Sequence, residues 1–160
     1  MKKTAYLSLG SNLGDRRANL RNAIGKLLNL GNLLAVSSFY ETEPVEFTEQ
    51  AWFLNCAVAL QTELEAEDFL KEIMAIEREM GRQRTQPKGP RTIDIDILLF
   101  GKAVLRTPRL TIPHPAMQQR RFVLEPLTEI APDIRHPVSK KNMRELLNSL
   151  PLDGAVVRKA

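Results

Sequence analysis

Apolar residues alternate with polar residues in some parts of the chain and recur every three or four positions in others. Alternating and β-branched runs predict strands over residues 4–9, 33–41, 52–62, 93–100 and 103–106. Helical spacing predicts helices over roughly 15–31, 65–80, 122–130 and 139–150. A last short edge strand is expected over residues 155–157.

The order of these elements predicts the fold class. The chain begins β-α-β-β-α-β, which is the order of the ferredoxin-like unit, and a further strand and helix follow. Because 33–41 and 52–62 can pair as a hairpin, we expect an α+β fold, with a mainly antiparallel sheet packed with helices in α/β/α layers. A chain of 160 residues has about the size of one domain, so residues 1–160 are predicted to form a single domain.

Two aspartates mark the start of the strand predicted over 93–100. Asp94 and Asp96 are two positions apart, so they share one face of the strand, and the intervening isoleucines point to the other face. The apolar run 98–100 predicts that the strand enters a buried centre rather than following a rim. An ordinary half-exposed strand could carry such a polar face, but Asp is a poor strand residue. We therefore favour a Mg²⁺ site, since hard cations prefer carboxylate oxygens.

Positive residues flank the aspartates on both sides. They are Arg82, Arg84, Lys88 and Arg91 in the preceding loop, and Arg106, Arg109, His114, Arg120 and Arg121 after the strand. Arginine and lysine around a metal site suit a polyphosphate, because metal ions neutralise some phosphate oxygens and guanidinium groups hold the others. The run 118–121 could instead be a solvated face, so we assign a role to Arg120 and none to Arg121.

Composition limits the protein class. A net charge of +4 and a pI of 9.4 fit an anionic partner, which leaves nucleic acid, a nucleotide or no such partner open. The single cysteine, Cys56, lies in an apolar run and is expected to be a core residue, which fits a reducing cytoplasm. Polar residues interrupt the first apolar stretch before it reaches the length of a signal, and no run is long enough to span a membrane.

Three further residues could serve either the core or a ligand. Asn55 is an amide within an apolar strand, so its side chain requires hydrogen-bond partners from a neighbouring loop or from a bound molecule. Phe53 and Phe122 taken alone are more typical of core packing, although a flat ring would need such aromatic faces.

Five motifs in order resemble the family of 6-hydroxymethyl-7,8-dihydropterin pyrophosphokinase, an enzyme of folate synthesis. They are Leu-Gly-Ser-Asn-Leu-Gly at 9–14, Ser-Ser-Phe-Tyr-Glu-Thr-Glu-Pro at 37–44, Phe-Leu-Asn-Cys-Ala at 53–57, Gly-Pro-Arg-Thr-Ile-Asp-Ile-Asp-Ile-Leu at 89–98 and Ile-Pro-His-Pro at 112–115. The resemblance covers nearly the whole chain, and the run at 89–98 is highly specific. It implies a ferredoxin-like α+β fold and transfer of pyrophosphate from ATP to the pterin hydroxymethyl group, with AMP as the other product.

The resemblance also implies roles for individual residues. Asp94 and Asp96 would bind two Mg²⁺ ions that bridge the ATP phosphates, and Arg82 and Arg91 would act with them in catalysis. The rest of the ATP site would comprise Leu70, Arg84, Ile97, Leu110, Thr111, His114 and Arg120. The pterin would stack between Phe53 and Phe122, and its edge would meet Thr42, Pro44, Val45 and Asn55.

Such a reaction depends on geometry. The attacking hydroxyl must lie in line with the β-phosphorus and the departing AMP, so we expect positioning and electrostatics to supply most of the rate. The proton would pass to Asp96 or to a metal-bound water. We expect small-molecule substrates and no nucleic acid or membrane partner, and a monomer located in the cytoplasm.

Three positions depart from the family pattern, and two alternatives remain. Lys88 replaces a tryptophan of some members, Met74 replaces a polar residue near the adenine, and Phe53 occupies a position that can be tyrosine. A non-catalytic RNA-binding module with basic loops is one alternative, although the aromatic strand signature of an RNA-recognition motif is absent. The other is a relative that kept the fold and lost pterin selectivity.

Overall fold

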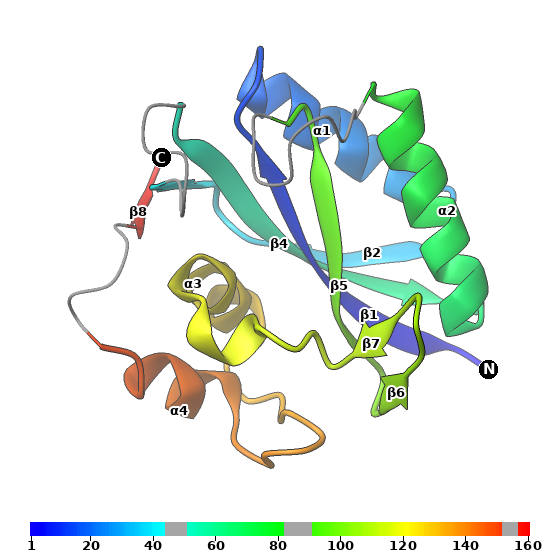
Figure 1. Ribbon diagram of the computed structural model, residues 1–160, viewed down its shortest axis with the longest axis vertical. Helices are drawn as coiled ribbons and strands as arrows, with labels where there is room; N and C mark the ends of the chain where they lie inside the picture. The colour runs from blue at the N-terminus through cyan, green and yellow to red at the C-terminus, as the bar shows by residue number, and fades with distance from the viewer. Residues whose placement is uncertain (44–50, 82–90, 152–156) are drawn as a thin grey trace.

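The computed structural model describes residues 1–43, 51–81, 91–151 and 157–160. Its strands are β1 (Lys3–Ser11), β2 (Asn32–Val36), β3 (Tyr40–Thr42), β4 (Phe53–Thr62), β5 (Asp94–Phe100), β6 (Leu105–Arg106), β7 (Thr111–Ile112) and β8 (Val157–Lys159). Its helices are α1 (Arg16–Leu27), α2 (Ala66–Glu79), the 3₁₀ helix η1 (Met117–Gln119), α3 (Arg121–Ile130) and α4 (Met143–Asn148) (Figure 1).

The main sheet has the predicted topology. Within the described residues, its strands follow the order β5-β1-β4-β3-β8, with β2 also paired to β4, and every pairing is antiparallel. With β2 and β3 counted together, the first four positions reproduce the ferredoxin-like order. The expected α+β fold and the hairpin between the second and third predicted strands are therefore confirmed.

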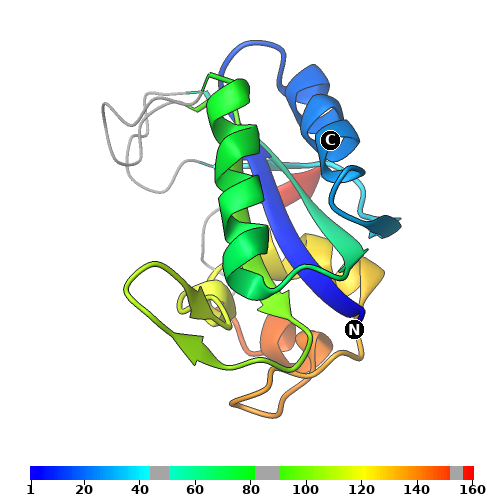
Figure 2. The same ribbon diagram turned by 90° about the vertical axis from the view of Figure 1, so that its right-hand side faces the viewer.

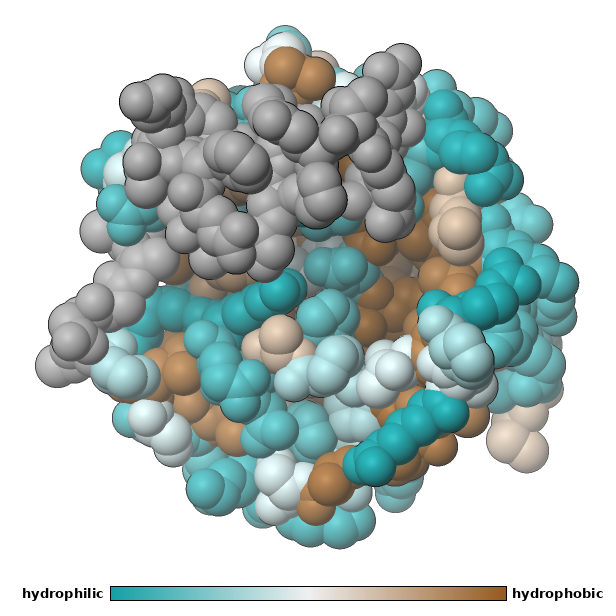
Figure 3. Space-filling view, in the orientation of Figure 1, coloured by the Kyte–Doolittle hydropathy of each residue, from teal (hydrophilic) through white to brown (hydrophobic). Residues whose placement is uncertain are grey.

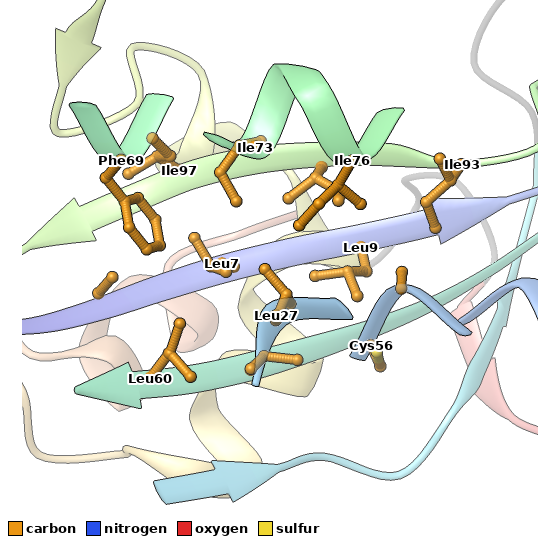
Figure 4. Close-up of a cluster of buried hydrophobic side chains, with 14 of the residues drawn as sticks. Leu7, Leu9, Leu27, Cys56, Leu60, Phe69, Ile73, Ile76, Ile93 and Ile97 are labelled. Atoms are coloured by element: carbon orange, nitrogen blue, oxygen red, sulfur yellow. The ribbon is translucent and has the colours of Figure 1, made fainter. Parts of the chain in front are cut away.

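Helices cover both faces of this sheet, as the α/β/α layering predicts. On one face, apolar residues of α1 and α2 such as Leu27, Phe69 and Ile73 pack on the inward residues of β1, β4 and β5 (Figure 4). Figure 2 looks onto α2 with β1 behind it. On the other face, α3 and α4 pack on Ala57 and Leu98. Cys56 belongs to the first core, and burial raises the pKa of its thiol to about 12.

Local capping explains where two helices begin. Asp15 caps α1 as predicted, because its carboxylate accepts a hydrogen bond from Ala18 N at 3.1 Å. The predicted start of the last helix at Ser139 is wrong. That helix begins at Met143, after Asn142 and Glu145 form a reciprocal capping box.

The strand predicted over 33–41 is also wrong in one respect, because it is two strands. Between β2 and β3, the Ser37 hydroxyl accepts a hydrogen bond from Ala57 N at 2.8 Å. Ser38 donates to the Glu129 carboxylate of α3 through both its backbone N–H (2.8 Å) and its hydroxyl (3.0 Å). Side-chain hydrogen bonds thus interrupt the strand. A strand at the end of the chain, β8, begins at Val157, the last residue of the strand predicted over 155–157, and residues 155 and 156 lie outside the described residues.

The position of β5 corrects a further prediction. Its apolar residues Leu98, Leu99 and Phe100 are buried as expected, but β5 lies at an edge of the sheet, with β1 as its sheet neighbour. Burial comes instead from the cores on both faces and from the segment after β7, where His114 N donates to Leu98 O at 2.9 Å. Periodicity reports burial, and it carries no information on which strands lie alongside.

Candidate active site

A cleft of about 940 Å³ opens on the face of the sheet that also carries α3. Figure 3 shows this side of the molecule, with apolar surface in a central hollow and hydrophilic residues around it. The cleft brings together every predicted site residue that the structure describes: Thr42, Phe53, Asn55, Leu70, Arg91, Asp94, Asp96, Ile97, Leu110, Thr111, His114, Arg120 and Phe122. These residues come from distant parts of the chain, so the fold alone assembles them.

The floor of the cleft is a row of paired strand positions. Gly10 of β1 pairs with Asp94 of β5 on one side and with Asn55 of β4 on the other. Neighbouring strands lie about 4.8 Å apart, so the backbones at Asp94 and Asn55 are separated by roughly 10 Å. The residue between them is glycine, so β1 adds no side chain of its own at this point of the cleft floor.

The acidic half is built on β5. Asp94 and Asp96 both line the cleft, as their shared face predicts, while Ile95 and Ile97 belong to the opposite core. Arg91 Nη1 lies 3.1 Å from Asp94 Oδ2, and both side chains are largely shielded from solvent. The backbone of Arg91 is in turn fixed by Asn12, whose Oδ1 accepts from Arg91 N at 2.7 Å and whose N–H donates to Arg91 O at 3.0 Å.

The donor chemistry of this half fits Mg²⁺. Mg²⁺ is commonly bound by one or two carboxylates, with phosphate oxygens and water as the remaining ligands. Across the described residues, no three His, Cys, Asp or Glu side chains gather into a metal cage. Asp94 and Asp96 are therefore the residues that would hold the ion, together with the phosphates of a nucleotide.

His114 contributes a neutral donor beside the acidic pair. Burial lowers the pKa of His114 below its usual value, and Arg120 lowers it further, while Asp94 acts in the opposite direction. Its Nδ1 accepts a hydrogen bond from Ala116 N at 3.2 Å, so the ring proton resides on Nε2. A neutral imidazole with an Nε2–H group can donate to a phosphate oxygen.

The other half of the cleft is aromatic and amide-lined. Phe53 on β4 and Phe122 on α3 both line it, and the Arg120 guanidinium carbon lies 5.5 Å from the centre of the Phe122 ring. The Asn55 side chain is buried, with 4% of the residue exposed, and bonds to Thr42 and to Leu9 O. Asn55 therefore has structural partners, which lie on neighbouring strands rather than in a loop, and it also lines the cleft, so its contact with a ligand stays a prediction.

A comparison with known protein families shows to which family the chain belongs. The family described as 7,8-dihydro-6-hydroxymethylpterin-pyrophosphokinase (HPPK) matches residues 6–132. The chain belongs to the HPPK family. The resemblance inferred from the sequence motifs is therefore confirmed.

Individual relatives differ in length. A 2-amino-4-hydroxy-6-hydroxymethyldihydropteridine pyrophosphokinase of Pseudomonas aeruginosa is 43% identical over 96% of this chain and 96% of its own length. The folic acid synthesis protein fol1 of Schizosaccharomyces pombe is 42% identical over 95% of this chain, yet the match spans only 21% of that protein. The chain therefore spans about a fifth of some relatives and nearly all of others.

Solved structures share the fold. A crystal structure of Plasmodium falciparum HPPK-DHPS, a triple mutant with pteroate, matches 92% of this chain and 43% of its own with a TM-score of 0.74 at 18% identity. A second structure, of HPPK-DHPS in complex with substrates, matches 93% of this chain and 43% of its own with a TM-score of 0.73 at 17% identity. The ferredoxin-like architecture is thus shared with HPPK domains.

Four residues that the HPPK resemblance assigns to the site cannot be placed. Arg82, Arg84, Pro44 and Val45 lie outside the described residues, so their roles remain predictions. The same holds for the departure at Lys88. Met74, the second departure, lines the cleft beside Leu70 on α2.

The sequence analysis gave no individual role to Glu77, Gly10 or Asn12, which line or support the cleft. Glu77 is buried on α2 and its Oε2 accepts a hydrogen bond from Ile95 N at 2.9 Å, between the two aspartates. A signal existed for it, because a carboxylate at position 77 falls on the apolar face with Phe69 and Ile73. Gly10 and Asn12 lie in the family motif at 9–14, but the contacts that give them a role are with segments distant in sequence. No helix of the described residues is both long and apolar enough to span a bilayer.

Proposed function

We propose that this chain transfers the pyrophosphoryl group of ATP to the hydroxymethyl oxygen of 6-hydroxymethyl-7,8-dihydropterin in folate biosynthesis, with release of AMP. The observation that carries the proposal is the row Asp94, Gly10 and Asn55 across the sheet. A carboxylate pair suited to metal-bound phosphates and an amide suited to a polar ring thus stand on backbone positions roughly 10 Å apart. Membership of the HPPK family supports the same reaction.

The two substrates would occupy the two halves of the cleft. The adenine and ribose would lie against Leu70, Ile97, Leu110 and Thr111, and the phosphates would meet Arg82, Arg84, Arg91, His114 and Arg120. The pterin ring would stack between Phe53 and Phe122, with its edge toward Thr42, Pro44, Val45 and Asn55.

The chain's contribution to catalysis is mainly positioning and charge. The substrate hydroxyl oxygen forms a bond to the β-phosphorus while the bond from that phosphorus to the α,β-bridging oxygen breaks, and AMP leaves with that oxygen. Magnesium, when bound by Asp94 and Asp96, neutralises phosphate oxygens. Arg91, held against Asp94, directs its guanidinium toward the same phosphates, and His114 donates from Nε2. The hydroxyl proton passes to Asp96 or to water.

Finer properties belong to the same proposal. As the resemblance to the HPPK family implies, Asp94 and Asp96 would hold two Mg²⁺ ions. The chain would act as a monomeric single domain, since one chain supplies both halves of the described cleft. The buried thiol of Cys56 fits a reducing cytoplasm.

The decisive experiment measures AMP release with ATP, magnesium and 6-hydroxymethyl-7,8-dihydropterin. Release should require both the pterin and the metal. In Asp94→Asn it should fall at least a hundredfold, roughly the loss expected when a preorganised charge near the phosphates is removed. The matched control is Asp133→Asn, an exposed carboxylate paired with Arg144 at 3.0 Å, which should retain full turnover. AMP release at the same rate without the pterin would overturn the proposal. An undiminished rate of AMP release in Asp94→Asn would also overturn it.

A further inference from the structure

The Asn55 amide on β4 is held in one orientation by groups on the two neighbouring strands, β1 and β3. Its Oδ1 accepts a hydrogen bond from the Thr42 hydroxyl of β3 at 2.5 Å. Its Nδ2 donates to Leu9 O of β1 at 3.3 Å. A carbonyl oxygen can only accept, so a flipped amide would place its own oxygen against Leu9 O and lose that bond. The direction of the amide is therefore fixed.

Gly10 makes room for the nitrogen end of this amide. A Cβ atom at residue 10 would lie 2.6 Å from Asn55 Nδ2 and 3.4 Å from Phe53 Cδ1. The first distance is too short for any side chain, so the amide can lie over residue 10 only when that residue is glycine. Thr42 at one end and the bare backbone at the other end thus hold the same group.

The orientation decides what the amide can offer a ligand. An amide oxygen has two acceptor sites and an amide nitrogen has two N–H donors. Thr42 uses one acceptor site and Leu9 uses one donor. One acceptor and one donor remain, side by side and in fixed order, in a residue that lines the cleft.

We propose that Thr42, through its hydroxyl, and Gly10, through its missing side chain, are positioning residues that make the Asn55 amide selective for a 2-amino-4-oxo ring over a 2,4-diamino ring. This rests on the pterin subsite of the proposed function. The 4-oxo ring presents an N–H donor beside a carbonyl acceptor, which complements the oxygen and nitrogen of a fixed amide. In the 4-amino ring the order is reversed, because ring nitrogen N3 is an acceptor and the 4-amino group is a donor. A fixed Asn55 amide would then place its oxygen against the acceptor N3 and its N–H against the 4-amino N–H.

The test compares the affinities of two non-reacting probes, 6-hydroxymethylpterin and 2,4-diamino-6-hydroxymethylpteridine, by calorimetry. Wild-type protein should prefer the oxo ring. Thr42→Val has the same shape but no hydroxyl, so the amide keeps only its bond to Leu9 O and can turn out of line with the ring edge. The preference for the oxo ring should therefore narrow about tenfold, as expected for one or two mismatched hydrogen bonds. Thr42→Ser keeps the hydroxyl and should restore the wild-type preference for the oxo ring. Gly10→Ala displaces the amide while Thr42 is unchanged, so it should also narrow this preference.

The matched control is Thr62→Val, farther along β4. Thr62 is as buried as Thr42, with 1% against 3% exposed, and its hydroxyl donates to Leu30 O at 2.8 Å away from the cleft. The Thr62→Val protein should be less stable than wild type and should keep the wild-type preference for the oxo ring. A Thr42→Val protein with an unchanged preference would overturn the positioning role.

Two further results keep the outcomes distinct. If wild-type protein binds neither ring, both the pterin subsite and the positioning roles of Thr42 and Gly10 are wrong. The reaction itself is tested separately, by AMP release. If the variants do not fold, nuclear Overhauser contacts in the wild-type protein decide the matter. The Asn55 side-chain N–H protons should contact the Gly10 α-protons, and a contact with the Thr42 methyl group in their place would contradict the orientation.

Discussion

Replacing Glu77 with methionine tests how the outer edge of β5 is held. Glu77 has 6% of its surface exposed, and its Oε2 accepts a hydrogen bond from Ile95 N at 2.9 Å. Methionine has a similar length and helix preference, so the change removes the acceptor while largely keeping the packing. A buried N–H that loses its partner costs about 2 kcal/mol. For a domain of this size, that corresponds to a fall in Tm of roughly 4–8 °C.

The assay pairs thermal unfolding with AMP release at increasing magnesium concentration. Because Ile95 separates Asp94 and Asp96, a looser edge should also raise the magnesium concentration needed for half-maximal turnover. Glu77→Gln keeps an acceptor and should recover most of both losses. The control is Glu79→Met on the same helix, whose carboxylate lies 2.7 Å from Lys26 but is 62% exposed and should matter little. A Glu77→Met protein that unfolds within about 1 °C of wild type, with unchanged magnesium dependence, would refute the reasoning.

Three other predictions follow from the cleft and its surroundings. Phe122→Ala should weaken pterin binding about tenfold or more in calorimetry, because a stacking face is lost. ATP binding should weaken less, through the lost contact of the ring with Arg120, and equal losses for both ligands would contradict the stacking role. Arg91→Lys keeps the charge but not the planar fork beside Asp94, so AMP formation should fall about tenfold or more, and wild-type rates would count against the role of the fork. Burial lowers the pKa of His136 below its usual 6.5. As the pH falls through 6.5, His136 therefore becomes protonated in the unfolded chain before it does so in the folded chain. The stability that is present above pH 6.5 should be lost progressively below it. As the pH falls below 6.5, the unfolding temperature of His136→Asn should fall less than that of wild type. An identical fall in the two proteins would exclude His136 as the source of the pH dependence.

Local patterns account for the parts of the fold that the sequence predicts well. The spacing of two along 93–97 suffices to put Asp94 and Asp96 on one face, since side chains of a strand alternate whatever the strand pairs with. Asp15 caps α1 because the cap involves only residues within one turn. For the same reason, the apolar stripe of α2 predicts its buried face.

The errors arise where distant groups compete with local preference. The run 33–41 is apolar and aromatic enough to be predicted as one strand, yet Ser38 donates hydrogen bonds to the Glu129 carboxylate of α3, 91 residues away, and the strand divides. The edge position of β5 has a similar cause, because pairing order depends on all the strands together.

For the site, the sequence by itself determined the chemistry: an acidic pair on one strand face, basic residues around it, and the motifs of the HPPK family. Only the tertiary structure decided how these groups meet. Pairing of β1 with both β4 and β5 sets Gly10 between Asp94 and Asn55, and α2 brings Glu77 to the backbone between the two aspartates. Hydrogen-bond register across strands fixes these distances, and no periodicity along a single segment encodes which residue will lie opposite another.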